Sequence, residues 1–70
     1  MIRSPVASSS LVSVGYDPET RELEVQFVTG SIYRYFGVLP SAYQALVRAA
    51  SKGRHFNESI RDRYRFHRLA

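Results

Sequence analysis

The sequence has no cysteine, only two histidines and no long apolar run. Without cysteine the chain makes neither disulfides nor a thiolate zinc site, and this absence fits a reducing compartment. His55 and His67 are twelve residues apart with no carboxylate at ligand spacing, so no metal site is expected. No segment resembles a signal peptide or a membrane span. We therefore expect a cytoplasmic protein that binds no membrane.

Catalytic motifs are missing as well. The sequence contains no nucleophile elbow, no glycine-rich phosphate loop and no His-x-Glu arrangement. The hydroxyl of Ser41, at the start of a helical pattern, is interpreted as a helix cap and not as a nucleophile. We expect a protein that is not an enzyme and that uses no cofactor.

The sequence is instead rich in aromatic and basic residues. Nine of its 70 residues are Tyr or Phe and 44% are hydrophobic, which is typical of a folded chain near the lower size limit for one domain. Residues 1–47 carry a net charge of −1, whereas residues 48–70 carry +5. This asymmetry favours an acidic partner, nucleic acid first. The alternative is a solvated basic tail that keeps the chain soluble.

Three strands are expected, over residues 11–16, 22–28 and 31–36. The second is the clearest, because its apolar side chains alternate strictly with polar ones. After Pro40, the pattern predicts a helix capped by Ser41 and stopped by Gly53, with Tyr43, Leu46, Val47 and Ala50 on its buried face. A short second helix is expected over residues 54–60. Residues 61–70 are interpreted as either a short edge strand or an extended tail.

The hairpin register decides where Tyr33 and Tyr35 point, because a shift by one residue reverses every side chain. A two-residue loop, Thr29-Gly30, would expose both tyrosines and put Arg34 on the apolar face. A three-residue loop that ends at a left-handed Gly30 gives other partners. It pairs Val25 with Tyr33, Leu23 with Tyr35, and Glu24 with Arg34. This register satisfies both the charges and the apolar side chains, so we predict that the tyrosines lean on the core.

The predicted fold is α+β, with a three-stranded antiparallel sheet followed by one longer and one short helix on one face, in the order β-β-β-α-α. Residues 1–10 are interpreted as a flexible leader and residues 11–70 as a single domain. The predicted core comprises Val12, Val14, Leu23, Val25, Phe27, Tyr33, Tyr35, Leu39, Tyr43, Leu46, Val47, Ala50, Phe56 and Ile60.

Two stretches resemble a known family. One is Tyr33-x-Tyr35 with the following Gly37-Val38-Leu39-Pro40, and the other is Lys52-Gly53-x-x-Phe56-Asn57-x-x-Ile60-Arg61. Together with the helix that carries Tyr43, they are similar to the KTSC domain over roughly residues 8–69. That small domain is named for the C-terminal part of some lysyl-tRNA synthetases and also occurs as a stand-alone bacterial protein. The resemblance implies no established activity, and RNA binding as a suggested role. It matches Tyr33 and Tyr35 to the hallmark pair of the family, and Asn57 and Arg61 to its C-terminal motif.

The expected partner is RNA, either tRNA or a single strand, bound by a monomer through its basic C-terminal segment. Arginines there would neutralise phosphates, and aromatic residues interleaved among them would stack on bases. The candidate contact residues are Lys52, Arg54, Asn57, Arg61, Arg63, Tyr64 and Arg65. Tyr33 and Tyr35 are interpreted as chiefly structural.

Alternative interpretations exist for several of these residues. Tyr64 and Phe66 would pack the segment onto the domain while the arginines remain solvated. Asn57 would close a helix connection, and Arg61 would pair with Glu58 or Asp62. The competing function is a protein-interaction module that uses an open edge of the sheet.

Overall fold

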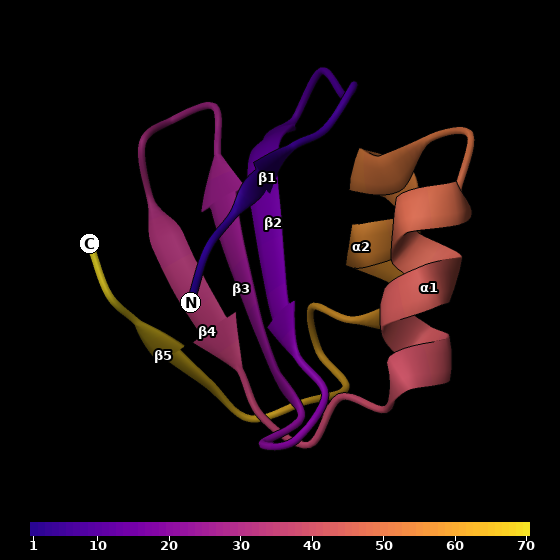
Figure 1. Ribbon diagram of the computed structural model, residues 1–70. Coiled ribbons are helices and arrows are strands. Elements are labelled where there is room, and N and C mark those ends of the chain that lie inside the picture. The colour runs from indigo at the N-terminus through magenta and orange to yellow at the C-terminus, as the bar shows by residue number, and fades with distance from the viewer.

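The computed structural model describes residues 1–70 and arranges them as one antiparallel sheet covered on one face by two helices (Figure 1). The sheet order is β1-β2-β3-β4-β5. The strands are β1 (Ser4–Pro5), β2 (Leu11–Asp17), β3 (Glu22–Phe27), β4 (Ile32–Tyr35) and β5 (Phe66–Arg68). The helices, α1 (Pro40–Arg48) and α2 (Lys52–Ser59), lie between β4 and β5 in the sequence.

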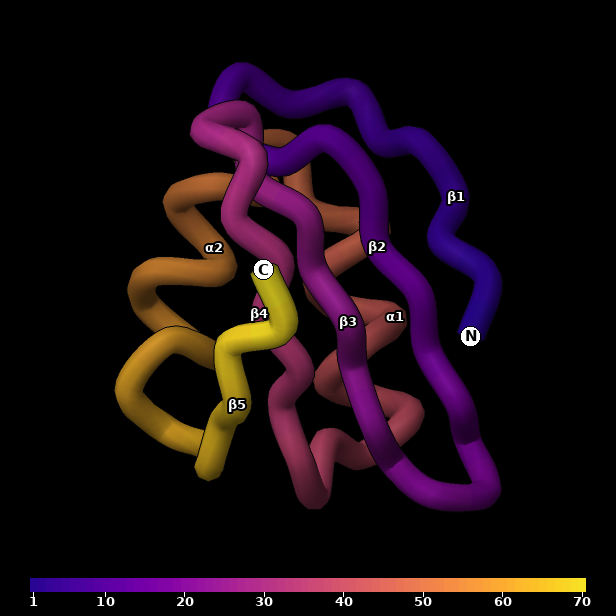
Figure 2. The backbone as a smooth tube through the Cα atoms, turned by 90° about the vertical axis from the view of Figure 1, so that its left-hand side faces the viewer, coloured from indigo at the N-terminus to yellow at the C-terminus, as the bar shows by residue number.

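The α+β class and the two helices are as predicted, but the count of three strands is wrong. Both extra strands are edges made by the ends of the chain, as Figure 2 shows. β1 comes from residues 1–10 and pairs Ser4 with Val14, and β5 comes from the basic C-terminal segment and pairs Phe66 with Tyr35. Of the two interpretations of residues 61–70, the short edge strand is therefore confirmed. β1 was not predicted, because a strand of two residues shows no alternation and is decided by tertiary pairing alone.

The predicted hairpin register is confirmed. β3 and β4 pair Leu23 with Tyr35, Glu24 with Arg34, and Val25 with Tyr33. The loop closes as expected, because the Gly30 N–H donates to the Phe27 carbonyl at 2.9 Å and Gly30 adopts a φ of +95°. Glycine has no Cβ to oppose that conformation.

A β-bulge in β2 overturns the prediction for Val12. Leu11 pairs with Phe27 and Ser13 with Gln26, so Val12 is an extra residue that is 41% exposed. The bulge puts Leu11 and Val14, three residues apart, into the same core. Val12 and Val14, both predicted in the core, therefore do not share one face of this strand.

The first helix begins two residues earlier than predicted. Leu39 is the N-cap and Pro40 is the first helical residue, whereas Ser41 lies inside the helix and its side chain makes no capping bond. Proline suits this position because the first helical N–H has no acceptor and the fixed φ is already helical.

The prediction that Gly53 stops the first helix is also wrong. The first helix ends at Arg48, where Ala49 turns to extended backbone, and Gly53 lies in the first turn of α2. A Cβ on Gly53 would lie 2.8 Å from the Ser10 hydroxyl oxygen. We infer that glycine is needed here because this turn packs closely against the connection between β1 and β2.

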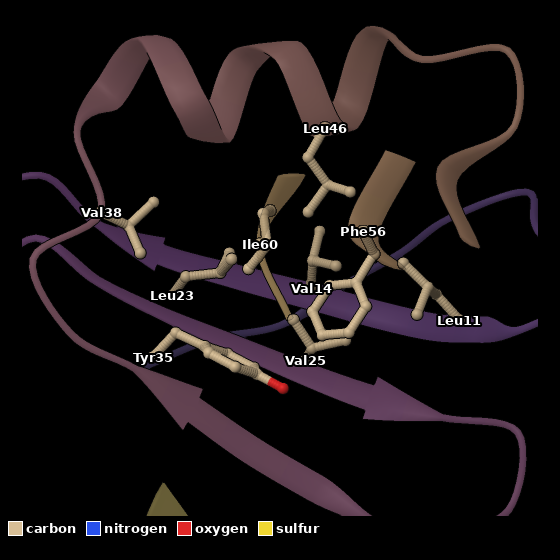
Figure 3. Packing of buried hydrophobic residues seen from close by; sticks show 9 residues of the cluster. All are labelled: Leu11, Val14, Leu23, Val25, Tyr35, Val38, Leu46, Phe56 and Ile60. Carbon is tan, nitrogen blue, oxygen red and sulfur yellow. The ribbon is translucent and has the colours of Figure 1, made fainter. Parts of the chain in front are cut away.

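The core lies between the sheet and the helices (Figure 3). Its nine buried residues are Leu11, Val14, Leu23, Val25, Tyr35, Val38, Leu46, Phe56 and Ile60. Phe27, Tyr33, Tyr43 and Val47 are partly buried against this cluster. Besides Val12, two predicted core residues are exposed: Leu39, at 47%, and Ala50. The sequence also failed to indicate Leu11, the first residue of β2, and Val38, which lies in the connection between β4 and α1.

The other face of the sheet carries a buried carboxylate. Glu24 is 5% exposed and forms ion pairs with Arg34, across the hairpin, and with Arg3 of the N-terminal segment. That segment crosses the sheet over Gly15, where a Cβ would lie 2.7 Å from the Ile2 carbonyl oxygen. Arg34 is therefore committed to structure and is not available to a ligand.

Candidate functional site

The larger hollow of the molecule, about 450 Å³, opens between α2 and the β4–β5 side of the sheet. Five aromatic side chains and five polar ones line it. The aromatic residues are Phe27, Tyr33, Tyr35, Phe56 and Phe66, and the polar ones are Thr29, Ser31, Asn57, Arg61 and Asp62. We call this hollow the aromatic pocket. Its size is within the range of about 300–1,000 Å³ that is usual for small-molecule sites.

The five rings form one connected set. Tyr35 and Phe56 are buried, at 4% and 3% exposure, with centroids 5.3 Å apart. Phe66 on β5 is 57% exposed, and its ring lies 5.6 Å from that of Tyr33. Phe27 packs edge-on against Tyr33 at 5.8 Å. These separations are typical of interacting aromatic pairs. The pocket therefore has a buried floor, formed by Tyr35 and Phe56, and more accessible rings around it.

The end of α2 brings Asn57 and Arg61 together. The Phe56 carbonyl accepts hydrogen bonds from the N–H groups of both Ile60 and Arg61, at 3.0 and 2.9 Å. This closure keeps the chain after α2 within a turn of Asn57, so Asn57, Arg61 and Asp62 all reach the pocket. Their side chains take part in none of the hydrogen bonds or ion pairs within the protein. All three are free to meet a ligand.

A further arginine lies beside the pocket. The guanidinium of Arg68 lies 5.9 Å from the centre of the Tyr33 ring and donates to the Ser31 hydroxyl at 3.3 Å. Both partners line the pocket. Arg68 therefore adds positive charge at the β5 side, while Arg61 supplies it at the α2 side.

Burial raises the pKa of Tyr35 to about 12. The neighbouring Tyr33 and the Asp62 carboxylate raise it further, whereas Arg61 lowers it. Because desolvation penalises the phenolate, the Tyr35 hydroxyl stays protonated at neutral pH and can donate a hydrogen bond.

Tyr35 should titrate near its raised pKa of about 12, above the ordinary tyrosine value of 10.0. A phenol whose pKa is raised on folding contributes stability that is complete below about pH 10 and disappears as the pH rises through about 12. Tyrosinate absorbance followed against pH should therefore lose a late step in Tyr35→Phe. A titration unchanged by that substitution while circular dichroism still reports a folded chain would contradict the assignment.

The structure separates the other predicted contact residues from the pocket. Lys52 donates through its amine to the Ala49 carbonyl at 3.1 Å, where it closes the turn between the helices. Arg54 is exposed and lies 3.6 Å from Glu58, one turn along α2. Arg65 precedes β5, and its main-chain carbonyl accepts from the Phe36 N–H. None of the three lines the aromatic pocket.

Arg63 and Tyr64 belong to a second, more open hollow of about 330 Å³ between the helices. Tyr64 is half-buried and packs against the core, as the structural interpretation of this residue expects. Arg63 is exposed beside His55 and Ile60. These two residues therefore lie in a hollow separate from Tyr33 and Tyr35.

Three aromatic residues and one carboxylate of the pocket were missing from the predicted site. They are Phe27, Phe56, Phe66 and Asp62. The alternation of basic and aromatic residues over 61–68 was the one signal for Phe66, and it required β5 to be recognised as a strand. Phe27 and Phe56 were predicted as core residues, and Phe56 is one; that their rings also border a pocket depends on the packing of α2 against the sheet, which the sequence does not show.

Nowhere do three or more His, Asp or Glu side chains gather closely enough to hold a metal ion. Neither helix is long and apolar enough to cross a bilayer. The arrangement is that of a small α+β domain with an aromatic pocket and cationic groups at its edge.

Comparison with known proteins identifies the family. The KTSC domain family matches residues 7–64, and the chain therefore belongs to the KTSC domain family. The crystal structure of a KTSC domain protein from Yersinia pestis superposes with a TM-score of 0.95 at 40% identity, and the match covers 99% of this chain and 97% of that one.

Two relatives show the settings in which this sequence occurs. An uncharacterized protein of Stutzerimonas stutzeri is 50% identical over 99% of both chains. A lysine–tRNA ligase of Nostoc punctiforme is 39% identical over 89% of this chain, but the chain spans only 11% of the length of that enzyme. Similar sequences thus occur in a protein of about the same length and within a much longer one.

Proposed function

We propose that the protein binds single-stranded RNA, with a base held in the aromatic pocket and the phosphates contacting the surrounding arginines. The observation that carries this proposal is the set of five connected rings that share one pocket with the unpaired side chains of Asn57 and Arg61. Recognition of unpaired RNA depends on aromatic rings that stack on bases and on cationic groups that track the backbone.

The charge distribution supports the same ligand. Residues 48–70 carry +5, and Arg61 and Arg68 stand on two sides of the pocket. The similarity to a lysine–tRNA ligase is consistent with this proposal, because the name of that enzyme says that it joins lysine to tRNA. Loops and ends of a tRNA offer the unstacked bases that such a pocket accepts.

A protein partner added at the sheet edge is less well supported. The edge strands β1 and β5 have two and three residues, and β1 includes Pro5, which has no N–H to donate. Short edges with proline are a common way to prevent pairing with another chain. β1 and β5 thus lie along the edges of β2 and β4. Those are the edges that the protein-interaction alternative expected to be open.

Fluorescence anisotropy with labelled single-stranded RNA and with tRNA tests the proposal. Binding should weaken steeply with salt, because each neutralised phosphate of a single strand contributes about −0.7 to the slope of log K against log salt. The absence of binding to every RNA at low salt would overturn the proposal, whereas co-purification of a defined protein partner without nucleic acid would favour the interaction module.

Arg61→Ala should weaken binding to all sequences alike. It should also reduce the magnitude of the slope of log K against log salt by the contribution of about one phosphate contact. Arg61 is exposed and makes no internal pair, so the melting temperature should hardly change. Arg21→Asn is a matched control: it removes an exposed arginine outside the pocket, and asparagine tolerates the φ of 59° at that position. Equal losses in the two variants would show that only overall charge matters.

A further inference from the structure

The aromatic pocket contains one negative charge, which a purely phosphate-binding site would not have. Asp62 is the only carboxylate among the ten lining residues. It forms no ion pair, although Arg61 is adjacent to it in the sequence. Asp62 is exposed to solvent on this side of the molecule, and a carboxylate repels phosphate, so we expect Asp62 to face a part of the ligand that donates hydrogen bonds.

A base edge is the part of an RNA strand that donates in this way. Guanine presents two neighbouring donors, N1–H and the N2 amine, next to the O6 acceptor. Adenine and cytosine place an acceptor beside their single amine, and uracil places its one N–H between two carbonyls. A carboxylate accepts two parallel N–H groups, so guanine is the one base that satisfies both of its oxygens.

The neighbouring polar groups complete this pattern. Asn57 lines the same pocket and its amide is unpaired within the protein. Its NH₂ group can donate to O6 while Asp62 accepts from N1 and N2. Phe66 provides an accessible ring for one face of the base, the partly exposed Tyr33 ring lies beside it, and Arg61 remains for the phosphate.

We propose that the aromatic pocket selects guanine, and that Asp62 is the residue that determines this specificity. The inference rests on the proposed function, since it names the base that the RNA-binding pocket prefers. Asp62 is exposed in the free protein, but a base stacked in the pocket would shield its carboxylate from water, so a base that leaves the carboxylate oxygens unpaired would bind more weakly.

The experiment compares a labelled oligouridine with the same strand carrying one guanosine, inosine, adenosine or cytidine in the middle. A single substitution avoids the stacking and quadruplex formation of guanine runs. The guanosine strand should bind about 5- to 100-fold more tightly than oligouridine. The inosine strand, which lacks only the N2 amine, should lose part of this gain, and the adenosine and cytidine strands should show little gain.

Asp62→Asn should abolish the preference for guanosine and leave the affinity for oligouridine unchanged or slightly higher, because a negative charge is removed. Glu19→Gln removes an exposed carboxylate outside the pocket and should keep the full preference. Equal binding of all strands by the unaltered protein overturns guanine selection while RNA binding stands. A preference retained in Asp62→Asn overturns the role of Asp62, and no binding to any strand overturns the proposed function itself.

Discussion

Replacing Leu46 with alanine should lower the melting temperature by at least about 10 °C, the largest stability effect expected of a single substitution here. Leu46 is 0% exposed and is the one fully buried residue of α1, so it anchors this helix to the sheet. Figure 3 shows its side chain pointing from α1 toward the core residues Val14 and Phe56. Removing its side chain deletes buried apolar contacts and leaves a cavity, at a cost of about 2–5 kcal/mol.

The size of the domain makes this cost severe. A chain of 70 residues is typically stable by only about 4–10 kcal/mol. Urea and thermal melts followed by circular dichroism measure the loss directly.

Leu39→Ala is the matched control for Leu46→Ala. Leu39 was predicted to lie in the core but is 47% exposed at the start of α1. Its truncation should change the free energy of unfolding by no more than about 0.5 kcal/mol. If the two variants melted at the same temperature, the packing of α1 on the sheet would be wrong.

The hairpin was predictable because several local rules agreed on it. The Glu24–Arg34 charge pair, the alternation along β3 and the left-handed Gly30 all require one register. The presence of two helices was predictable for a similar reason, although their ends were not: Leu46 was expected on the buried face of the first, and Phe56 and Ile60, four residues apart, marked the buried side of the second.

The failures occurred where distant segments decide the structure. The bulge at Val12 changes which side chains of β2 face the helices. Gly53 was interpreted by its usual role at helix ends, whereas the contact with Ser10 explains it. β5 forms only because the chain after α2 returns along β4, and such long-range pairing leaves little trace in three residues.

The aromatic pocket was predicted in part and missed in part. The resemblance to the family brought Tyr33, Tyr35, Asn57 and Arg61 into one hypothesis, and the structure places all four around a single hollow. Their interpretation changes accordingly. Tyr35 lies in the core, as predicted, whereas Tyr33 packs against the core but is partly exposed and contacts Phe66 on β5.

Phe66→Ala should produce the largest loss of RNA binding, because Phe66 is the most exposed ring of the pocket. A stacked base is worth about 1–3 kcal/mol, which corresponds to a loss of roughly 5- to 150-fold in affinity. The side chain is 57% exposed, so the melting temperature should fall only slightly. Anisotropy titrations and thermal melts on the same samples separate the two effects.

Two further variants identify what the ring contributes. Phe66→Leu keeps an apolar side chain without a π face, so it should bind nearly as weakly as Phe66→Ala if stacking is the interaction. Phe36→Ala removes a ring from the chain just after β4, outside the pocket, and should leave affinity unchanged. Unaltered binding by Phe66→Ala would mean that the arginines hold RNA through charge alone, with the rings serving only the fold.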